Sequence, residues 1–225
     1  KLSKNYINIK LNKNSLFKSQ SKEYVNNFVN LHKDQKADLV EIHNRPNYII
    51  LMNKIKSKLV LYFHNDPITM VGSKKSNERI NLLSVCEKII FNSEWSKKRF
   101  LLNINPIYIK SQKLEVIHQS INSKKIDLNK KNKLITFVGK LNKAKGFDLF
   151  AKAIKKILDK HNDWKAIVIG DEFREKIPLQ HKNLKLIGFQ KHEKVLKVFE
   201  KSSIAVACSR WEEPFGRTSL EAASR

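Results

Sequence analysis

Two glutamates near the end of the chain, Glu213 and Glu221, have the residue type and spacing of a pair that binds hydroxyl groups. Seven residues separate them within SRWEEPFGRTSLEAASR, residues 209–225. An ionised carboxylate accepts short, strong hydrogen bonds, so a loop carboxylate can bind sugar hydroxyls and a helix carboxylate can bind both hydroxyls of a ribose. The pattern places Glu213 in a loop and Glu221 one turn into a helix.

The residues between the two glutamates suit a phosphate group. Pro214 and Gly216 predict a turn after an apolar run, with a helix beginning at Gly216. Backbone N–H groups at a helix start, aided by the helix dipole, favour an anion. Arg217, Thr218 and Ser219 would add donors in the first turn. The segment therefore predicts a diphosphate site between two carboxylates.

The elements that must position these residues alternate between short β-branched runs and longer stretches of helical period. The expected strands are residues 37–43, 58–64, 88–92, 114–118, 134–138, 165–169, 183–187 and 203–207. The expected helices are residues 21–32, 47–56, 77–85, 94–102, 146–160, 192–201 and 216 onward. Strand–helix alternation with continuously apolar strands predicts an α/β fold with doubly wound parallel sheets, which bind ligands at the carboxyl ends of their strands.

One polar, aperiodic stretch divides the chain. Residues 120–133 read SINSKKIDLNKKNK, which predicts a first domain at 1–122, a linker at 123–133 and a second domain at 134–225. The first part offers few strands and the second stops inside a helix, so both domains are expected to be incomplete.

Composition limits the function classes. The chain has 225 residues, 41% of them hydrophobic, which is typical of a folded protein. No apolar run approaches the roughly 20 residues that span a bilayer, and no signal peptide is visible. The net charge of +24 allows binding to nucleic acid or to an anionic membrane. Because the lysines are scattered, without an arginine-rich patch, we favour compositional drift with mild membrane attraction and regard nucleic acid as an unlikely partner.

Several motifs together resemble retaining GT-B glycosyltransferases of glycosyltransferase family 4, also called group 1. The segment EEPFGRTSLEA resembles the Glu-x7-Glu signature of that family. VGKLNKAKG at residues 138–146 resembles the VGR…KG element that opens the second domain, with lysine in place of the more usual arginine at Lys140. KLVLYFHNDP at residues 58–67 resembles the strand that ends in a histidine facing the transferred sugar, and His43 ends another strand.

The resemblance implies two Rossmann-like domains that face each other across a cleft, the first on the acceptor side and the second binding the nucleotide sugar. It implies donor-binding roles for Lys140, Lys145, Glu213, Phe215, Gly216, Arg217, Thr218 and Glu221. It implies catalytic roles for His64 and Glu213. No metal and no cofactor are expected, because fixed cations would offset the charge of the leaving diphosphate.

The implied function is transfer of a hexose, with retention, from a UDP- or GDP-linked donor to a saccharide or lipid-linked acceptor in cell-envelope polysaccharide or lipopolysaccharide synthesis. We expect a cytoplasmic protein that also contacts the inner face of the membrane peripherally. Alternatives are a phosphorylase or epimerase of the same fold, a binding-only remnant, and a basic nucleic-acid-binding protein. Because both domains are expected to be incomplete, this fragment of a glycosyltransferase can be inactive by itself. On the family pattern the complete protein would be longer.

Overall fold

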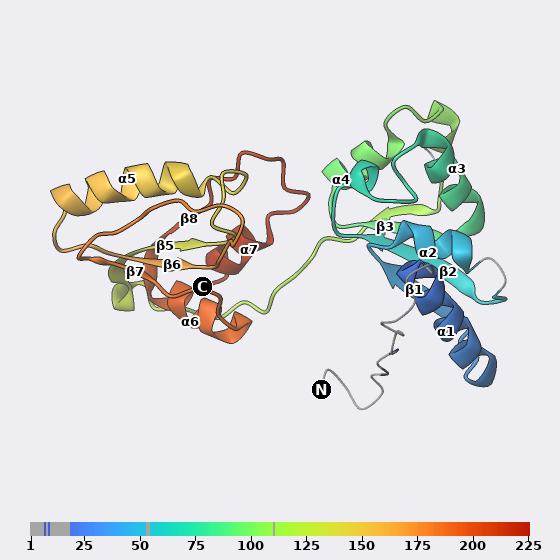
Figure 1. Ribbon diagram of the computed structural model, residues 1–225, viewed down its shortest axis with the longest axis horizontal. Coiled ribbons are helices and arrows are strands. Elements are labelled where there is room, and N and C mark those ends of the chain that lie inside the picture. Colours follow the sequence, from blue (N-terminus) through green and yellow to red (C-terminus); the bar gives the residue numbers. More distant parts are fainter. Residues whose placement is uncertain (1–6, 8, 10–18, 53–54, 110) are drawn as a thin grey trace. The chain divides into compact units, whose positions relative to one another are not determined.

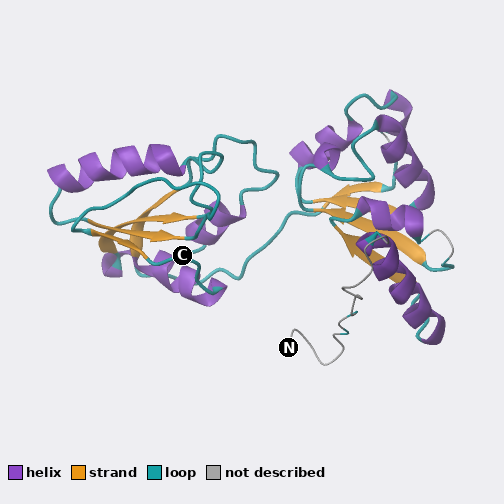
Figure 2. Cartoon of the chain, viewed as in Figure 1, coloured by secondary structure: helices purple, strands orange, loops and turns teal. Residues whose placement is uncertain are grey.

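The computed structural model describes residues 7, 9, 19–52, 55–109 and 111–225. The described residues form two compact α/β units, which meet in the sequence between His118 and Gln119 (Figure 1). Each unit has one parallel sheet with helices packed against it (Figure 2). The predicted α/β class with parallel sheets is therefore confirmed. No described helix is long and apolar enough to cross a membrane.

The first unit contains a four-stranded parallel sheet in the order β1-β2-β3-β4. Its strands are β1 (Leu39–His43), β2 (Lys58–Phe63), β3 (Lys88–Phe91) and β4 (Leu114–Val116). Its helices are α1 (Gln20–Asp34), α2 (Pro46–Leu51), α3 (Ser76–Val85) and α4 (Glu94–Leu101), with short 3₁₀ turns η1 (Pro67–Thr69) and η2 (Pro106–Tyr108). The described strands of this unit follow chain order without a reversal.

The second unit contains a four-stranded parallel sheet in the order β7-β6-β5-β8. Its strands are β5 (Asn132–Val138), β6 (Lys165–Ile169), β7 (Leu184–Leu186) and β8 (Ser202–Val206). Its helices are α5 (Phe147–Lys160), α6 (His192–Lys201) and α7 (Arg217–Ala223), preceded by the 3₁₀ turn η3 (Leu128–Lys130). The strand order reverses at β5, because β8 pairs with the side of β5 opposite to β6. A ligand is expected at the carboxyl ends of strands beside such a reversal.

Apolar packing holds the second sheet between helices on its two faces. On one face, α5 buries Phe147, Phe150 and Ile154 against Phe137 of β5, because its apolar residues recur every three or four positions. On the other face, α6 buries side chains that include Phe199. Figure 1 shows α5 and α6 on opposite sides of the sheet. Burial of each of these large side chains contributes roughly 1.5–3 kcal/mol relative to exposure.

Two expectations from the sequence need adjustment. The helix predicted at residues 47–56 ends at Leu51, because the chain turns at Met52, whose N–H bonds to Tyr48 O and Ile49 O; residues 53 and 54 of that prediction lie outside the described residues. The predicted linker at 123–133 includes the start of β5, and its Lys124 Nζ lies 3.1 Å from Glu200 Oε1. The described residues of that segment therefore belong to the second unit.

Candidate functional site

A pocket of about 390 Å³ lies at the carboxyl ends of β5, β6 and β7 in the second unit. Its lining residues are Val138, Gly139, Lys140, Ile169, Gly170, Asp171, Phe189, Gln190, His192, Val195 and Glu221. The reversal of the strand order at β5 brings the loop after this strand and the segment after β8 to the same edge of the sheet. The position agrees with the ligand site expected for a sheet of this topology.

Glycine lets two of the lining strands approach closely. The backbone of Gly170 has a φ of +135°, and a Cβ atom there would lie 1.8 Å from Gly139 O. Gly139 N donates to Ile169 O at 3.0 Å, and Gly170 N donates to Gly188 O at 3.0 Å. Any larger residue at Gly170 would push apart the ends of β5 and β6, so this glycine fixes the pocket floor.

Glu221 is buried, with 7% of its surface exposed, and lines the pocket from α7. Its Oε1 atom accepts hydrogen bonds from Arg217 Nε at 2.8 Å and from His192 Nε2 at 3.0 Å. Among the described residues, none donates a hydrogen bond to its Oε2 atom. The carboxylate is thus held by one oxygen, and the second oxygen keeps its capacity to accept.

Glu213 lies in the loop after β8 and forms an ion pair with Lys145. Lys145 Nζ is 2.7 Å from Glu213 Oε1, and the hydroxyl of Ser209 donates to the same oxygen. Burial alone would raise the pKa of Glu213, but the hydrogen bonds from Lys145 and Ser209 and the lysine charge outweigh it and hold that pKa below its usual value. Lys145 Nζ also lies 5.3 Å from the centre of the Trp211 ring.

Two further contacts fix the loop that carries Glu213. Arg210 donates from Nη2 to Asp148 Oδ2 at 2.7 Å and from Nη1 to Lys143 O at 2.8 Å. The hydrogen bond from Arg210 lowers the pKa of Asp148 to about 2. Gly146 brings the loop before α5 against the end of β8, since a Cβ atom there would lie 1.9 Å from Cys208 O. These contacts place Lys145 beside Glu213.

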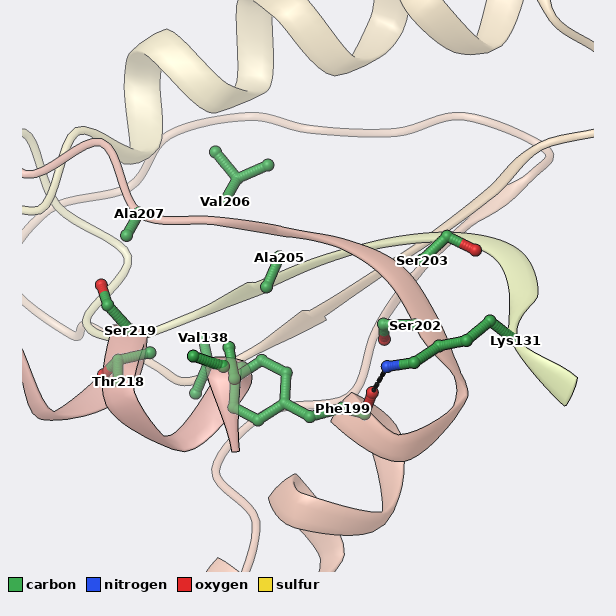
Figure 3. A pocket seen from close by; sticks show the side chains of 12 residues that line it. Lys131, Val138, Phe199, Ser202, Ser203, Ala205, Val206, Ala207, Thr218 and Ser219 are labelled. Carbon is green, nitrogen blue, oxygen red and sulfur yellow. Dashed lines mark hydrogen bonds between the residues drawn. The ribbon is translucent and has the colours of Figure 1, made fainter. Parts of the chain in front are cut away.

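A second groove, of about 330 Å³, lies between β8 and α7 (Figure 3). Small and hydroxyl side chains line it, among them Thr218 and Ser219 of α7. At one end Lys131 Nζ donates to Phe199 O at 3.0 Å. Thr218 therefore lines this groove and is not among the lining residues of the pocket that contains Glu221.

The structure brings some of the predicted site residues together and separates others. Lys140 and Glu221 line one pocket, and Lys145 pairs with Glu213 in the loops beside it. Arg217, expected to donate toward a phosphate, instead donates to Glu221. Gly216 is the residue before α7, with a φ of 76°, and Phe215 precedes it half-buried. The roles predicted for all of these residues remain predictions.

The carboxyl edge of the first sheet carries a chain of three side chains. His64 follows β2, and its Nε2 atom lies 2.7 Å from His43 Nδ1, with the two rings stacked at 5.0 Å. The other ring nitrogen of His43 lies 3.3 Å from Glu41 Oε1. Asn44, with a φ of 53°, accepts from the backbone N–H of His64 at 2.8 Å. The backbone and the side chain of His64 are thus both held by β1 and the residue after it.

Sequence reasoning missed Arg210, His192 and Glu41, and gave His43 only as a second strand-end histidine. Arg210 contacts Asp148, 62 positions away, and His192 contacts Glu221, 29 positions away, so neither pairing is visible in the local sequence. Glu41 contacts His43, two positions further along the same strand. The one available signal was alternation in β1, because residues two apart lie on the same face of a strand and Glu41 and His43 therefore share a face. No group of three or more His, Cys, Asp or Glu side chains in the described part of the chain could hold a metal ion.

Residues 118–225 match the model of a family described as "Glycosyl transferases group 1". Among curated proteins, the chain is similar to N-acetylgalactosamine-N,N'-diacetylbacillosaminyl-diphospho-undecaprenol 4-alpha-N-acetylgalactosaminyltransferase of Campylobacter jejuni. The identity is 28% over 143 residues, which cover 57% of this chain and 38% of the relative. The alignments with the curated relatives span between 27% and 38% of their lengths, so the similarity covers well under half of each relative.

Two solved structures show the same fold. TarM matches with a TM-score of 0.67 at 14% identity, over 90% of this chain and 43% of TarM. HepE of Anabaena, in complex with UDP-glucose, matches with a TM-score of 0.67 at 17% identity, over 90% of this chain and 61% of HepE. At these low sequence identities, the structural similarity shows the fold alone.

Proposed function

Since residues 118–225 match the group 1 glycosyltransferases and the fold is that of GT-B enzymes, we propose that the chain is the donor-binding part of a retaining hexosyltransferase. The donor would be a UDP- or GDP-linked sugar bound at the carboxyl edge of the second sheet. The observation that carries this proposal is the placement of Glu221 and Glu213. One is buried in the pocket with an oxygen still able to accept, and the other lies beside Lys145 at the adjoining loop.

The ribose and the diphosphate of the donor would each have matching side chains. Glu221 would accept from the ribose hydroxyls, since an ionised carboxylate makes strong bonds to a diol. Lys140 and Lys145 would neutralise the diphosphate, and the backbone at Gly216, with Phe215, Arg217 and Thr218 beside it, would complete its surroundings. HepE was solved with UDP-glucose, which supports a nucleotide sugar as the ligand class.

Glu213 and Lys145 would act on the transferred sugar and on the leaving group. The low pKa of Glu213 keeps its carboxylate ionised at neutral pH, so it can accept from sugar hydroxyls. Lys145 would shift from Glu213 toward the diphosphate as negative charge develops there, which stabilises the transition state without a metal ion. In the proposed reaction the bond from the anomeric carbon to the diphosphate oxygen would break, a bond to the acceptor oxygen would form, and the proton of the acceptor hydroxyl would pass to the leaving diphosphate.

The acceptor and the first unit complete the proposal. His64 would contact the transferred sugar, and the acceptor hydroxyl would attack from the side of the leaving diphosphate, which retains the anomeric configuration. The name of the Campylobacter relative gives a diphospho-undecaprenol substrate, which supports a lipid-linked saccharide as the acceptor class and a role in cell-envelope synthesis. Such an acceptor would place the protein at the inner face of the cytoplasmic membrane.

The test is thermal stability of the chain with a panel of uridine, guanosine and adenosine diphosphate sugars. A ligand that binds only the folded state raises the melting temperature, by an amount equivalent to about 2.7 kcal/mol at 100 times its Kd. We expect a shift with one nucleotide class that is unchanged by EDTA and lost in Glu221→Ala. Glu212→Ala, which removes an exposed neighbouring carboxylate, is the matched control and should retain the shift.

The same nucleotide sugars, used in both melting and activity assays, separate the alternatives. A binding-only remnant would show the shift but no transfer in the complete protein when acceptor is supplied. A phosphorylase of this fold would consume inorganic phosphate, and an epimerase would convert the sugar without any acceptor. A nucleic-acid-binding protein would show no preference for one nucleotide class, and any shift would be the same in Glu221→Ala.

A further inference from the structure

The hydrogen bonds around Glu221 divide its acceptor capacity unequally between its two oxygens. A carboxylate offers about four lone-pair sites, two on each oxygen. Arg217 Nε and His192 Nε2 both donate to Oε1, at 2.8 Å and 3.0 Å. Within the described residues no donor reaches Oε2. Oε1 is therefore saturated, and both remaining lone pairs lie on Oε2.

From this count we propose that His192 is a positioning residue for the nucleotide, holding Glu221 so that Oε2 alone accepts both hydroxyls of the ribose. This inference rests on the proposed function, because it takes Glu221 as the ribose ligand. To the contact between Glu221 and the ribose it adds a second residue, His192 of α6, and the specific atom that accepts from the ribose, Oε2. The two lone pairs of Oε2 match the two hydroxyl groups of an unmodified ribose.

The position of His192 explains why it can orient the carboxylate. His192 is the first residue of α6, and its backbone is fixed by the first turn, in which Val195 N donates to Lys191 O at 3.2 Å. It reaches α7 from a separate helix and lines the same pocket as Glu221. Because a carboxylate has only acceptors, His192 must carry hydrogen on Nε2 to make this contact.

Arg217 cannot give the same restraint. It lies four residues before Glu221 on the same helix, and 63% of its side chain is exposed, against 48% for that of His192. A contact within one helix does not fix the rotation of the carboxylate relative to the strands that form the rest of the pocket. The contact with α6 does, since α6 packs on β5 and carries Val195 of the pocket lining. His192 therefore couples the ribose ligand to the pocket wall.

Burial makes this orientation effective. Glu221 is 7% exposed, so an unpaired carboxylate here would carry a large desolvation cost. The two hydrogen bonds to Oε1 offset part of this cost before any nucleotide binds. The ionisable groups around the pocket are Lys140 after β5, Asp171 after β6, and Arg217 and His192 at the starts of their helices.

The test is titration calorimetry of the whole 225-residue chain with UDP and with GDP, each paired with its 2′,3′-dideoxy counterpart. We expect His192→Ala to weaken binding of the ribonucleotide about ten- to a hundredfold, the effect of losing one hydrogen bond to a charged group. Binding of the dideoxy nucleotide should be the same in His192→Ala and in the wild type. His192→Gln, whose amide can donate, should restore most of the affinity.

His161→Ala is the matched control, because it removes an exposed imidazole from the same unit at the far end of α5 and should change nothing. An equal loss for the ribonucleotide and the dideoxy nucleotide would overturn the inference, since it would show a contact to the base or a general structural effect. Unchanged affinity in His192→Ala would also overturn it. A wild-type chain that binds neither UDP nor GDP would instead overturn the proposed function, and this inference with it.

Discussion

At the scale of the residue, the Lys145–Glu213 pair balances burial against hydrogen bonding. About a quarter of each side chain is exposed, 27% for Lys145 and 25% for Glu213, so solvent screening limits what the pair contributes to stability. The charge of Glu213 is needed in both states of the proposed site, with the lysine when the ligand is absent and with sugar hydroxyls when it is bound. The ion pair is therefore a contact that a ligand can replace, and its contribution to stability is small.

This pair makes the stability of the second unit depend on pH in a defined direction. The pKa of Glu213 in the folded chain lies below its reference value of 4.5, so the stabilisation is present above pH 4.5 and is lost as the pH falls below it through the folded-state pKa. We expect Lys145→Met to lower the free energy of unfolding by at most about 1 kcal/mol at neutral pH. Melting temperatures should converge with the wild type in acid; a constant difference at every pH would contradict this assignment.

At the same scale, the sequence predicted the identities of the ligand candidates better than their partners. The type and spacing of Glu213 and Glu221 were sufficient to place one in a loop and one in a helix, and the structure confirms both positions. The bond from His192 to Glu221 could not be predicted, because it depends on how α6 and α7 pack. Arg217 shows the same difficulty, since an arginine at a helix start can turn toward a phosphate or toward its own helix.

At the scale of the element, the approach of the loop before α5 to the end of β8 determines the site. Gly146 has a φ of 71° and Gly188 a φ of 65°, so both adopt the left-handed conformation. They differ in their surroundings. A Cβ atom at Gly146 would lie 1.9 Å from Cys208 O, whereas a Cβ atom at Gly188 would meet nothing within 4 Å.

Comparison of Gly146 with Gly188 separates the cost of the close approach to Cys208 from the cost of the left-handed conformation itself. Gly188→Ala should cost about 1–2 kcal/mol, the strain of the left-handed conformation alone. Gly146→Ala should cost clearly more, because the backbone at Cys208 must move as well, and it should separate Lys145 from Glu213. Chemical denaturation of the two variants checks this order. Equal losses would show that the loop can relax and that the close approach does not fix the site.

The elements themselves could be predicted because their signals are local. Short apolar runs form most of each strand of the second unit, and α5 repeats its apolar residues every three or four positions, so all five were predicted to within two residues. The helix predicted at 47–56 was too long, because nothing in the composition marks the turn at Met52. The order of the strands, and thus the reversal at β5, depends on pairing between distant segments and was expected only from the fold class.

At the scale of the whole molecule, charge and topology suggest different ligands at the two edges of the second sheet. The edge opposite the proposed donor site contains a pocket of about 620 Å³. Its lining includes the basic residues Lys133, Lys165, Lys182, Lys185 and Lys201. With a net charge of +24, the chain could bind a polyanion here without recognising any nucleotide. Among the described residues, this lysine-lined pocket is the most specific structural basis for the alternative of a nucleic-acid-binding protein.

The same net charge gives a prediction about membranes. We expect the chain to bind vesicles that contain anionic lipid at low salt, because each basic residue near such a surface contributes about 1 kcal/mol. The binding should disappear near 1 M salt, where the screening length falls to about 3 Å. Vesicles of phosphatidylcholine alone are the control. Cosedimentation that persists in high salt, or that is equal with neutral vesicles, would contradict an electrostatic contact.

Hydrogen–deuterium exchange of the whole chain, with and without saturating UDP or GDP, locates the nucleotide-binding site. We expect slower exchange at the carboxyl edge of the second sheet, in residues 138–146, 169–172, 186–195 and 209–222, with no change in Glu221→Ala at the same nucleotide concentration. Slower exchange at residues 132–134, 163–167 and 182–185, around the lysine-lined pocket, would contradict this expectation and would show that the chain binds nucleotides only as polyanions.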